Sequence, residues 1–199
     1  MITTWHDVQR FTVRSATEDL DARGEVRPLL LAFTGDEPCA LAYLRWFPKG
    51  AYHDPMIEVL SLASALGADR LAFAAGGRLT SLADPIPPVT AEGDLRQRAL
   101  VVEYVDGHHG PPRRHSMIHP FAETGGAVVW EDPVGLPDAQ GWIPRAMEVM
   151  VGHRDEMTAR ATDEDTIDQV FRCVALGHAV SLGPRVRARL ARAVRPAPR

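Results

Sequence analysis

The chain has 199 residues, of which 45% are hydrophobic and 24% charged, so it is long and apolar enough to form a buried core. No apolar run reaches the ~20 residues that a membrane helix needs, so we expect no membrane partner. The first residues lack a basic segment followed by an apolar one, and we therefore expect no secretory leader and a cytoplasmic location. Of the 22 basic residues 21 are arginine, which suggests a GC-rich bacterial genome and carries no functional information.

The net charge of -4 is unevenly distributed along the chain. Residues 183–199 carry six arginines and no acid, which leaves a balance of -10 in the rest. Arg185, Arg189 and Arg192 share one helical face, as a helix that contacts phosphates would need. The segment has no aromatic residues between its arginines, however, and the acidic remainder would repel nucleic acid. We therefore expect the segment to dock on the acidic surface of its own chain or of a second copy in a homo-oligomer, and we disfavour a nucleic-acid partner.

The N-terminal third of the chain predicts a hairpin of core strands. Residues 11–14 favour a short edge strand, and residues 17–20 favour the start of a helical turn. Residues 29–33 and 39–47 are apolar runs separated by a cluster of turn-forming residues, which indicates two buried strands. The two cysteines, one in the second run and one near the C-terminus, form no C-x-x-C pair, so we expect reduced, buried thiols.

A helix and a strand are predicted next. Asp54 before Pro55 is typical of a helix N-cap followed by the first helical residue, and Gly67 is typical of a C-terminal stop. Residues 54–66 are therefore expected to form a helix that packs on the sheet. Residues 70–75 are apolar and predict a strand. This strand and the hairpin strand before the helix would form a right-handed βαβ unit if they were parallel neighbours.

A pair of glycines, Gly76 and Gly77, predicts a tight hairpin turn, because both tolerate the positive φ of a type I′ turn. The partner strand would then be 78–82, and the proline-rich residues 84–94 would be irregular. The alternative is a loop with no second strand. An antiparallel meander is predicted after this region, from the apolar runs 99–105, 115–121 and 127–131.

Three helices are expected to close the chain. The first lies near residues 143–151. The second begins at Thr162, where a capping-box pattern starts, and the third opens with Gly183 and Pro184. The predicted fold is α+β: a mostly antiparallel sheet of five to seven strands with one helix packed on a face. Residues 1–152 would form this sheet domain and residues 153–199 a C-terminal helical segment packed on it, together one structural domain.

Four of the eight histidines fall within residues 108–119, which makes this segment the first place to look for chemistry near neutral pH. His115 and His119 are four strand residues apart, roughly 13 Å at about 3.3 Å each, so we do not expect them to bind one metal ion together. His108 and His109 lie between glycines and predict an exposed turn. Both are candidate ligand-binding residues. Three more are Arg113 and Arg114, which could hold an anion, and Asp132 in a later loop.

The predicted glycine hairpin would bring several of these groups to one rim of the sheet. Glu103 lies mid-strand among valines, which indicates an inward carboxyl with a raised pKa. With Val105 paired to His115, Glu103 would lie diagonal to His115 on the same face. With His53 at the same rim, these three residues are the candidate catalytic set and, if a divalent metal is the cofactor, its ligands. The alternative is a solvent-facing glutamate beside a surface histidine. Without the hairpin, His53 and the histidine segment lie on opposite sides of the protein.

Signature motifs for other chemistry are absent, since the chain has no G-x-S-x-G, no P-loop and no G-x-G-x-x-G. The sequence therefore favours a non-catalytic binding or assembly module. One alternative is a small hydrolase-type enzyme that uses the histidine and carboxylate rim, with or without a metal. A second alternative is nucleic-acid binding through the arginine-rich C-terminal helix. The sequence identifies no small-molecule ligand.

Overall fold

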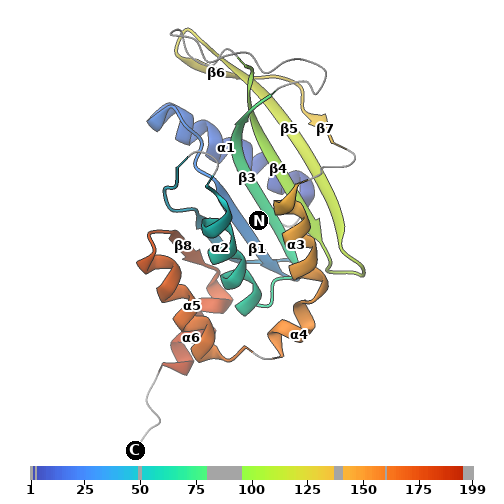
Figure 1. Ribbon diagram of the computed structural model, residues 1–199, viewed down its shortest axis with the longest axis vertical. Coiled ribbons are helices and arrows are strands. Elements are labelled where there is room, and N and C mark those ends of the chain that lie inside the picture. Colours follow the sequence, from blue (N-terminus) through green and yellow to red (C-terminus); the bar gives the residue numbers. More distant parts are fainter. Residues whose placement is uncertain are drawn as a thin grey trace, which may run out of the picture.

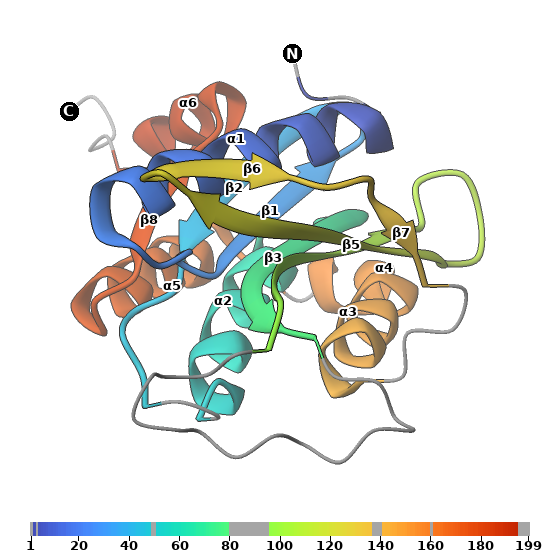
Figure 2. The same ribbon diagram turned by 90° about the horizontal axis from the view of Figure 1, so that it is seen from above.

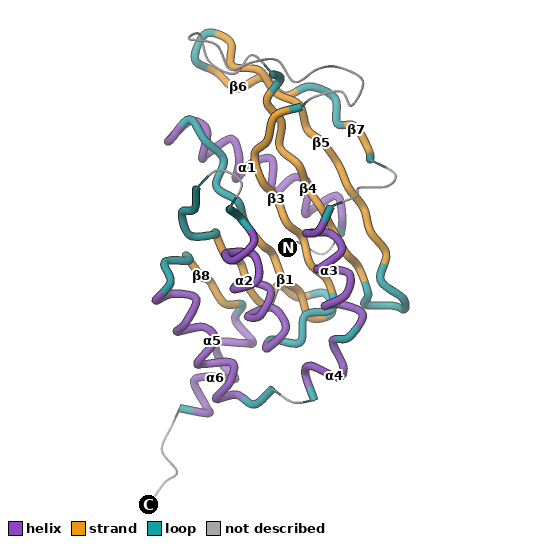
Figure 3. Tube along the Cα trace, viewed as in Figure 1, coloured by secondary structure: helices purple, strands orange, loops and turns teal. Residues whose placement is uncertain are grey.

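An antiparallel sheet forms the centre of the protein in a computed structural model that describes residues 2, 4–48, 51–79, 96–136, 141–159 and 161–194 (Figures 1 and 3). The strands follow the order β6-β5-β4-β3-β1-β2-β8, and the two-residue strand β7 pairs with β5. The α+β class and the antiparallel sheet are confirmed, although the described residues form eight strands, more than the predicted five to seven. In chain order the elements are α1 (Trp5–Arg23), β1 (Leu29–Thr34), β2 (Glu37–Tyr43), α2 (His53–Ala65), β3 (Arg70–Arg78), β4 (Arg98–Asp106), β5 (Arg113–Thr124), β6 (Ala127–Trp130), β7 (Val134–Gly135), α3 (Trp142–Gly152), α4 (Arg154–Thr158), α5 (Asp163–Ala175), β8 (Ala179–Leu182) and α6 (Pro184–Ala193).

The N-terminal segment forms one long helix, α1, so the edge strand predicted at residues 11–14 is wrong. Thr4 caps this helix: its hydroxyl accepts a hydrogen bond from the Asp7 backbone N–H, and the Asp7 carboxylate accepts one from the Thr4 N–H. Val8, Ala16 and Leu20 recur at helical spacing and are buried against the sheet. The cap and the buried stripe together stabilise this helix, although its β-branched residues favour a strand in the sequence pattern.

The hairpin of β1 and β2 is confirmed, but it alters the relation between β2 and β3. Both strands pair antiparallel with β1, which lies between them. They therefore run parallel without being neighbours, and the predicted βαβ unit of adjacent strands does not form. The crossover helix α2 begins one residue before Asp54, with Tyr52 at its N-cap and no side-chain cap. Asp54 is thus not the N-cap, whereas Gly67 has the expected left-handed φ of +68°.

The predicted hairpin at Gly76 and Gly77 is wrong, because both glycines lie inside β3. They pair with Leu100 and Ala99 of β4, so β3 continues through both glycines and runs antiparallel to β4. Gly76 instead permits a close approach: a Cβ there would lie 3.1 Å from the Cβ of Val26, in the segment that joins α1 to β1. Most of the proposed partner strand 78–82 and the irregular segment 84–94 lie outside the described residues.

Helices lie on both faces of the sheet (Figure 2), and each face has its own core. α1 covers one face, where Leu31, Ala72 and Val102 belong to its core. The opposite face is covered by α2, α3 and α5, and its core includes Phe73 and Val105. Because side chains alternate along a strand, neighbouring residues of β4 belong to different cores.

The C-terminal segment returns to the sheet. After α5, whose predicted capping box at Thr162 is confirmed, the chain adds β8 to the edge of β2, so this segment is not wholly helical. α6 then packs against α5 and β2 through its buried apolar side chains. Arg185 of α6 forms an ion pair with Glu37, and Arg189 with Asp163. None of the described helices is long and apolar enough to cross a membrane.

Candidate functional site

The structure does not bring the predicted rim residues together. His53 begins α2 and packs against Trp142. The histidine loop, residues 107–112, follows β4, and its His108 contacts Asp69 beyond the other end of α2. The helix between them is about 18 Å long at 1.5 Å per residue. His53 is therefore at the opposite end from His108 and His109, as expected when the glycine hairpin is absent.

Glu103 and His115 lie on opposite faces of the sheet. His115 pairs with Tyr104, and Glu103 pairs with Ser116, so the register differs by one residue from the predicted one. A shift of one residue reverses the face of every side chain in a strand. His115 consequently packs on the α1 face, where its ring lies 6.0 Å from that of Trp5.

Glu103 is buried on the other face, as the inward prediction required. Its carboxylate accepts a hydrogen bond from the Ser116 hydroxyl. Burial raises the pKa of Glu103, while the Ser116 hydrogen bond and the charge of Arg114 act in the opposite direction. Sequence reasoning thus identified an unusual carboxyl but paired it with the wrong neighbour.

The histidine loop contains a histidine–carboxylate pair that sequence reasoning missed. His108 Nδ1 lies 2.7 Å from Asp69 Oδ2, and the Gly35 N–H also donates to the Asp69 carboxylate. Asp69 is buried and His108 is half-buried, with its backbone N–H bonded to the Asp106 side chain. A carboxylate on one ring nitrogen fixes the imidazole orientation and leaves the other nitrogen for acid–base work or metal binding.

The other candidate ligand-binding residues do not converge on this pair. The His109 ring lies 4.2 Å from that of His108, but the side chain is exposed. Arg113 is exposed at the start of β5, and Arg114 lies 3.6 Å from Glu148 of α3. Asp132 is exposed after β6, far along the sheet from the histidine loop.

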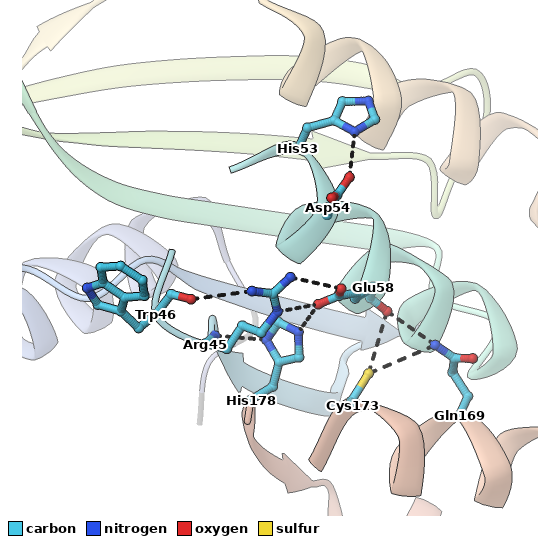
Figure 4. Close-up of polar contacts among 8 residues, drawn as sticks. All are labelled: Arg45, Trp46, His53, Asp54, Glu58, Gln169, Cys173 and His178. Carbon is cyan, nitrogen blue, oxygen red and sulfur yellow. Dashed lines mark hydrogen bonds and ion pairs between the residues drawn. The ribbon is translucent and has the colours of Figure 1, made fainter. Parts of the chain in front are cut away.

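A second histidine network connects α2, α5 and the sheet edge (Figure 4). The Arg45 backbone N–H donates to His178 Nδ1 at 3.0 Å, so His178 Nε2 carries the hydrogen and donates to Glu58 at 2.7 Å. Arg45 also donates to both Glu58 oxygens through its guanidinium, at 2.9 and 3.1 Å. Chiefly because of the Arg45 hydrogen bond, the pKa of Glu58 is lowered. Every polar atom of the His178 ring has a partner, which is the pattern of a structural core histidine.

The two cysteines are free, buried thiols, as predicted. Burial raises the pKa of Cys39 to about 11 and also raises that of Cys173. Cys173 Sγ lies 3.5 Å from the Glu58 backbone oxygen, at the edge of the His178 network. Neither thiol is placed or ionised as a nucleophile would be.

A hollow in the described surface lies beside α1, between this helix and the outer strands β5 and β6. It has a volume of about 440 Å³, within the range of small-molecule sites. One flank of α1 contributes residues at helical spacing, and the sheet contributes residues from its α1 face. We call this hollow the α1 groove. Its lining consists of His6, Gln9, Arg10, Val13, Arg14, Thr17, His119, Val128, Trp130 and Pro133.

His119 in the floor of the α1 groove is an unusual buried histidine. It is 8% exposed, and its Nε2 has no hydrogen-bond partner among the described residues. Burial lowers the pKa of His119, which favours the neutral ring. Unsatisfied buried polar atoms are rare and costly in folded proteins, so this ring is the least satisfied buried histidine of the described chain.

Over the described part of the chain, no three histidine, cysteine, aspartate or glutamate side chains lie close enough to hold a metal ion. The predicted metal set of His53, Glu103 and His115 is therefore not assembled. Comparison with protein-family models, with curated proteins and with solved structures finds no match to this chain.

Proposed function

We propose that the protein is a non-catalytic binding module and that its small-molecule site is the α1 groove. The observation that carries this proposal is the groove itself, a hollow of about 440 Å³ that combines an apolar wall with polar and basic side chains. Small-molecule sites combine these features, because apolar walls supply affinity and a few polar groups fix the orientation of the ligand. His119 supports the proposal, because its buried Nε2 lacks a partner among the described residues. Such an atom lowers the stability of the fold, so a role in ligand binding would explain its presence.

The test is a ligand screen that compares the wild type with a variant in which the groove is filled. Small organic molecules are screened by thermal unfolding, and each stabilising molecule is measured again on Val13→Trp. Ligands of the α1 groove raise the Tm of the wild type and lose this effect in the variant, because binding to the folded state alone stabilises it. Stabilising ligands that act equally on both proteins would contradict the proposal.

Acid–base chemistry at Asp69 and His108 is the second candidate function, favoured by their 2.7 Å contact and by the partial exposure of the His108 ring. The test is hydrolysis of p-nitrophenyl esters over a range of pH. Enzymatic activity would fall to background in His108→Gln and remain in His153→Gln, a matched change at an exposed histidine. Equal rates in both variants would contradict this function.

The location and the partners are proposed with the binding function. Two free cysteines support the reducing cytoplasm. The ion pairs of Arg185 and Arg189 within the chain support a docked C-terminal helix over a nucleic-acid contact. Self-association stays a prediction, and light scattering coupled to size-exclusion chromatography measures it directly.

A further inference from the structure

We propose that the α1 groove selects organic anions with an apolar body, and that Arg10 and Arg14 bind the anionic group. The inference depends on the function proposed above and adds a ligand class to it. The observation that supports it is that the groove has a basic margin on α1 and an apolar wall on the sheet.

The basic margin is formed by neighbouring turns of one helix. Arg10 and Arg14 are four residues apart, so their side chains extend from the same side of α1, and His6 lies one turn before them. The described lining of the groove contains these basic groups and no carboxylate. Two guanidinium groups at this spacing match a carboxylate, sulfonate or phosphate group, which each can bind through paired N–H donors.

Acidic neighbours do not saturate the two arginines. Arg10 lies 2.5 Å from Asp7 Oδ1, and Arg14 lies 4.0 Å from Glu18 at the edge of ion-pair range. The other Asp7 oxygen is used by the cap of α1, where it accepts from Thr4. Each guanidinium carries five N–H donors, so one ion pair leaves donors for a ligand. Both arginine side chains are mostly exposed, which leaves them accessible to it.

The apolar wall can hold the body of such a ligand. Trp130 is the largest side chain of the lining, and its orientation is fixed by a 3.0 Å hydrogen bond from its indole N–H to Thr17. Its ring also packs 5.0 Å from that of Phe121. An indole held in this way offers an ordered apolar surface and loses little conformational entropy on binding.

The experiment uses two fluorescent probes that share an anilinonaphthalene body and differ in charge: 8-anilinonaphthalene-1-sulfonate and neutral N-phenyl-1-naphthylamine. Dissociation constants are measured for the wild type and for the double variant Arg10→Gln/Arg14→Gln. We expect the variant to raise the Kd of the sulfonate probe about tenfold, because charge-assisted hydrogen bonds are lost. The Kd of the neutral probe should change by less than about twofold, since it has no anionic group to lose.

Further variants control for binding elsewhere. Val13→Trp and Gln9→Trp each fill the groove and should weaken both probes, and two positions are used in case one variant fails to fold. Arg172→Gln is the matched control, because it removes an exposed arginine next to the exposed Phe171 of α5, where apolar dyes could also bind. It should leave both dissociation constants unchanged.

The outcomes separate the two proposals. If the groove-filling variants weaken both probes and the arginine variant weakens neither, the anion preference is wrong and the groove remains a binding site. If folded groove-filling variants bind both probes as the wild type does, the probes bind elsewhere, and both proposals are overturned. An effect of Arg172→Gln equal to that of the double variant would also overturn the role of Arg10 and Arg14.

Discussion

The two faces of the sheet hold two buried histidines in contrasting environments. On the α2 face, His178 has a partner for each ring nitrogen, and its network extends through Glu58 to Arg45. On the α1 face, His119 has an Nε2 with no partner among the described residues, under an open groove. Both rings are removed from water, so burial does not separate them. Hydrogen-bond satisfaction does: the first face is closed and structural, and the second is the better place for a ligand.

The same substitution should have opposite effects at these two positions, and the larger effect is expected at His178. His178→Leu leaves the Arg45 backbone N–H without its acceptor and removes one donor from Glu58. We expect the free energy of unfolding to fall by about 3 kcal/mol, since each stranded buried group costs about 1–3 kcal/mol. Urea denaturation of the wild type and the variant measures it. A loss below about 1 kcal/mol would show that the network contributes little.

A smaller effect of opposite sign is expected on the α1 face. His119→Leu removes the buried Nε2 and keeps an apolar side chain in the floor of the groove. The free energy of unfolding should rise by about 1 kcal/mol, because an unsatisfied polar atom is replaced by carbon. The same urea titration at pH 7.5 measures the change. Destabilisation here would mean that the ring makes interactions equivalent to those of His178.

The smallest effect is a difference in pH dependence between the faces. The folded pKa of His119 is lowered from its ordinary 6.5, so the unfolded chain takes up a proton below that pH while the folded chain does not. The advantage of His119→Leu over the wild type should therefore grow as the pH falls below 6.5. The pKa of Glu58 is lowered from 4.5, so its contribution is complete above that pH and is lost as the pH falls below it. Unfolding of wild type, His119→Leu and Glu58→Gln from pH 2 to 8 separates the two windows, and parallel curves would contradict the assignment.

Local signals in the sequence predicted most of the sheet but missed α1. The pattern Thr-x-x-Asp occurs at Thr4 and again at Thr162, and it caps a helix at both places. The sequence predicts a cap only at Thr162, because the residues after Thr4 include β-branched side chains that favour strands. Long-range packing against the sheet decides the outcome in α1, and no local propensity contains that information.

The site was harder to predict than the fold, because it depends on register. A shift of one residue in the pairing of β4 with β5 places Glu103 and His115 on opposite faces of the sheet. The two glycines that favour a turn, Gly76 and Gly77, belong to the continuous strand β3. Asp69 precedes β3 and gave no signal of its contact with His108, 39 residues away. The α1 groove is not among the predicted sites, because six of its ten lining residues belong to α1, a helix that is not predicted.

The order of synthesis has a consequence for the sheet edge. His178 is separated by 133 residues from Arg45 and by 120 from Glu58, and β8 follows it immediately. A growing chain therefore displays β2 as an unpaired edge until residues 179–182 have left the ribosome. Exposed strand edges template pairing with other chains, so the nascent protein is open to aggregation during this interval. Strand β8 thus protects the first hairpin, and its pairing with β2 ends the exposure of that edge.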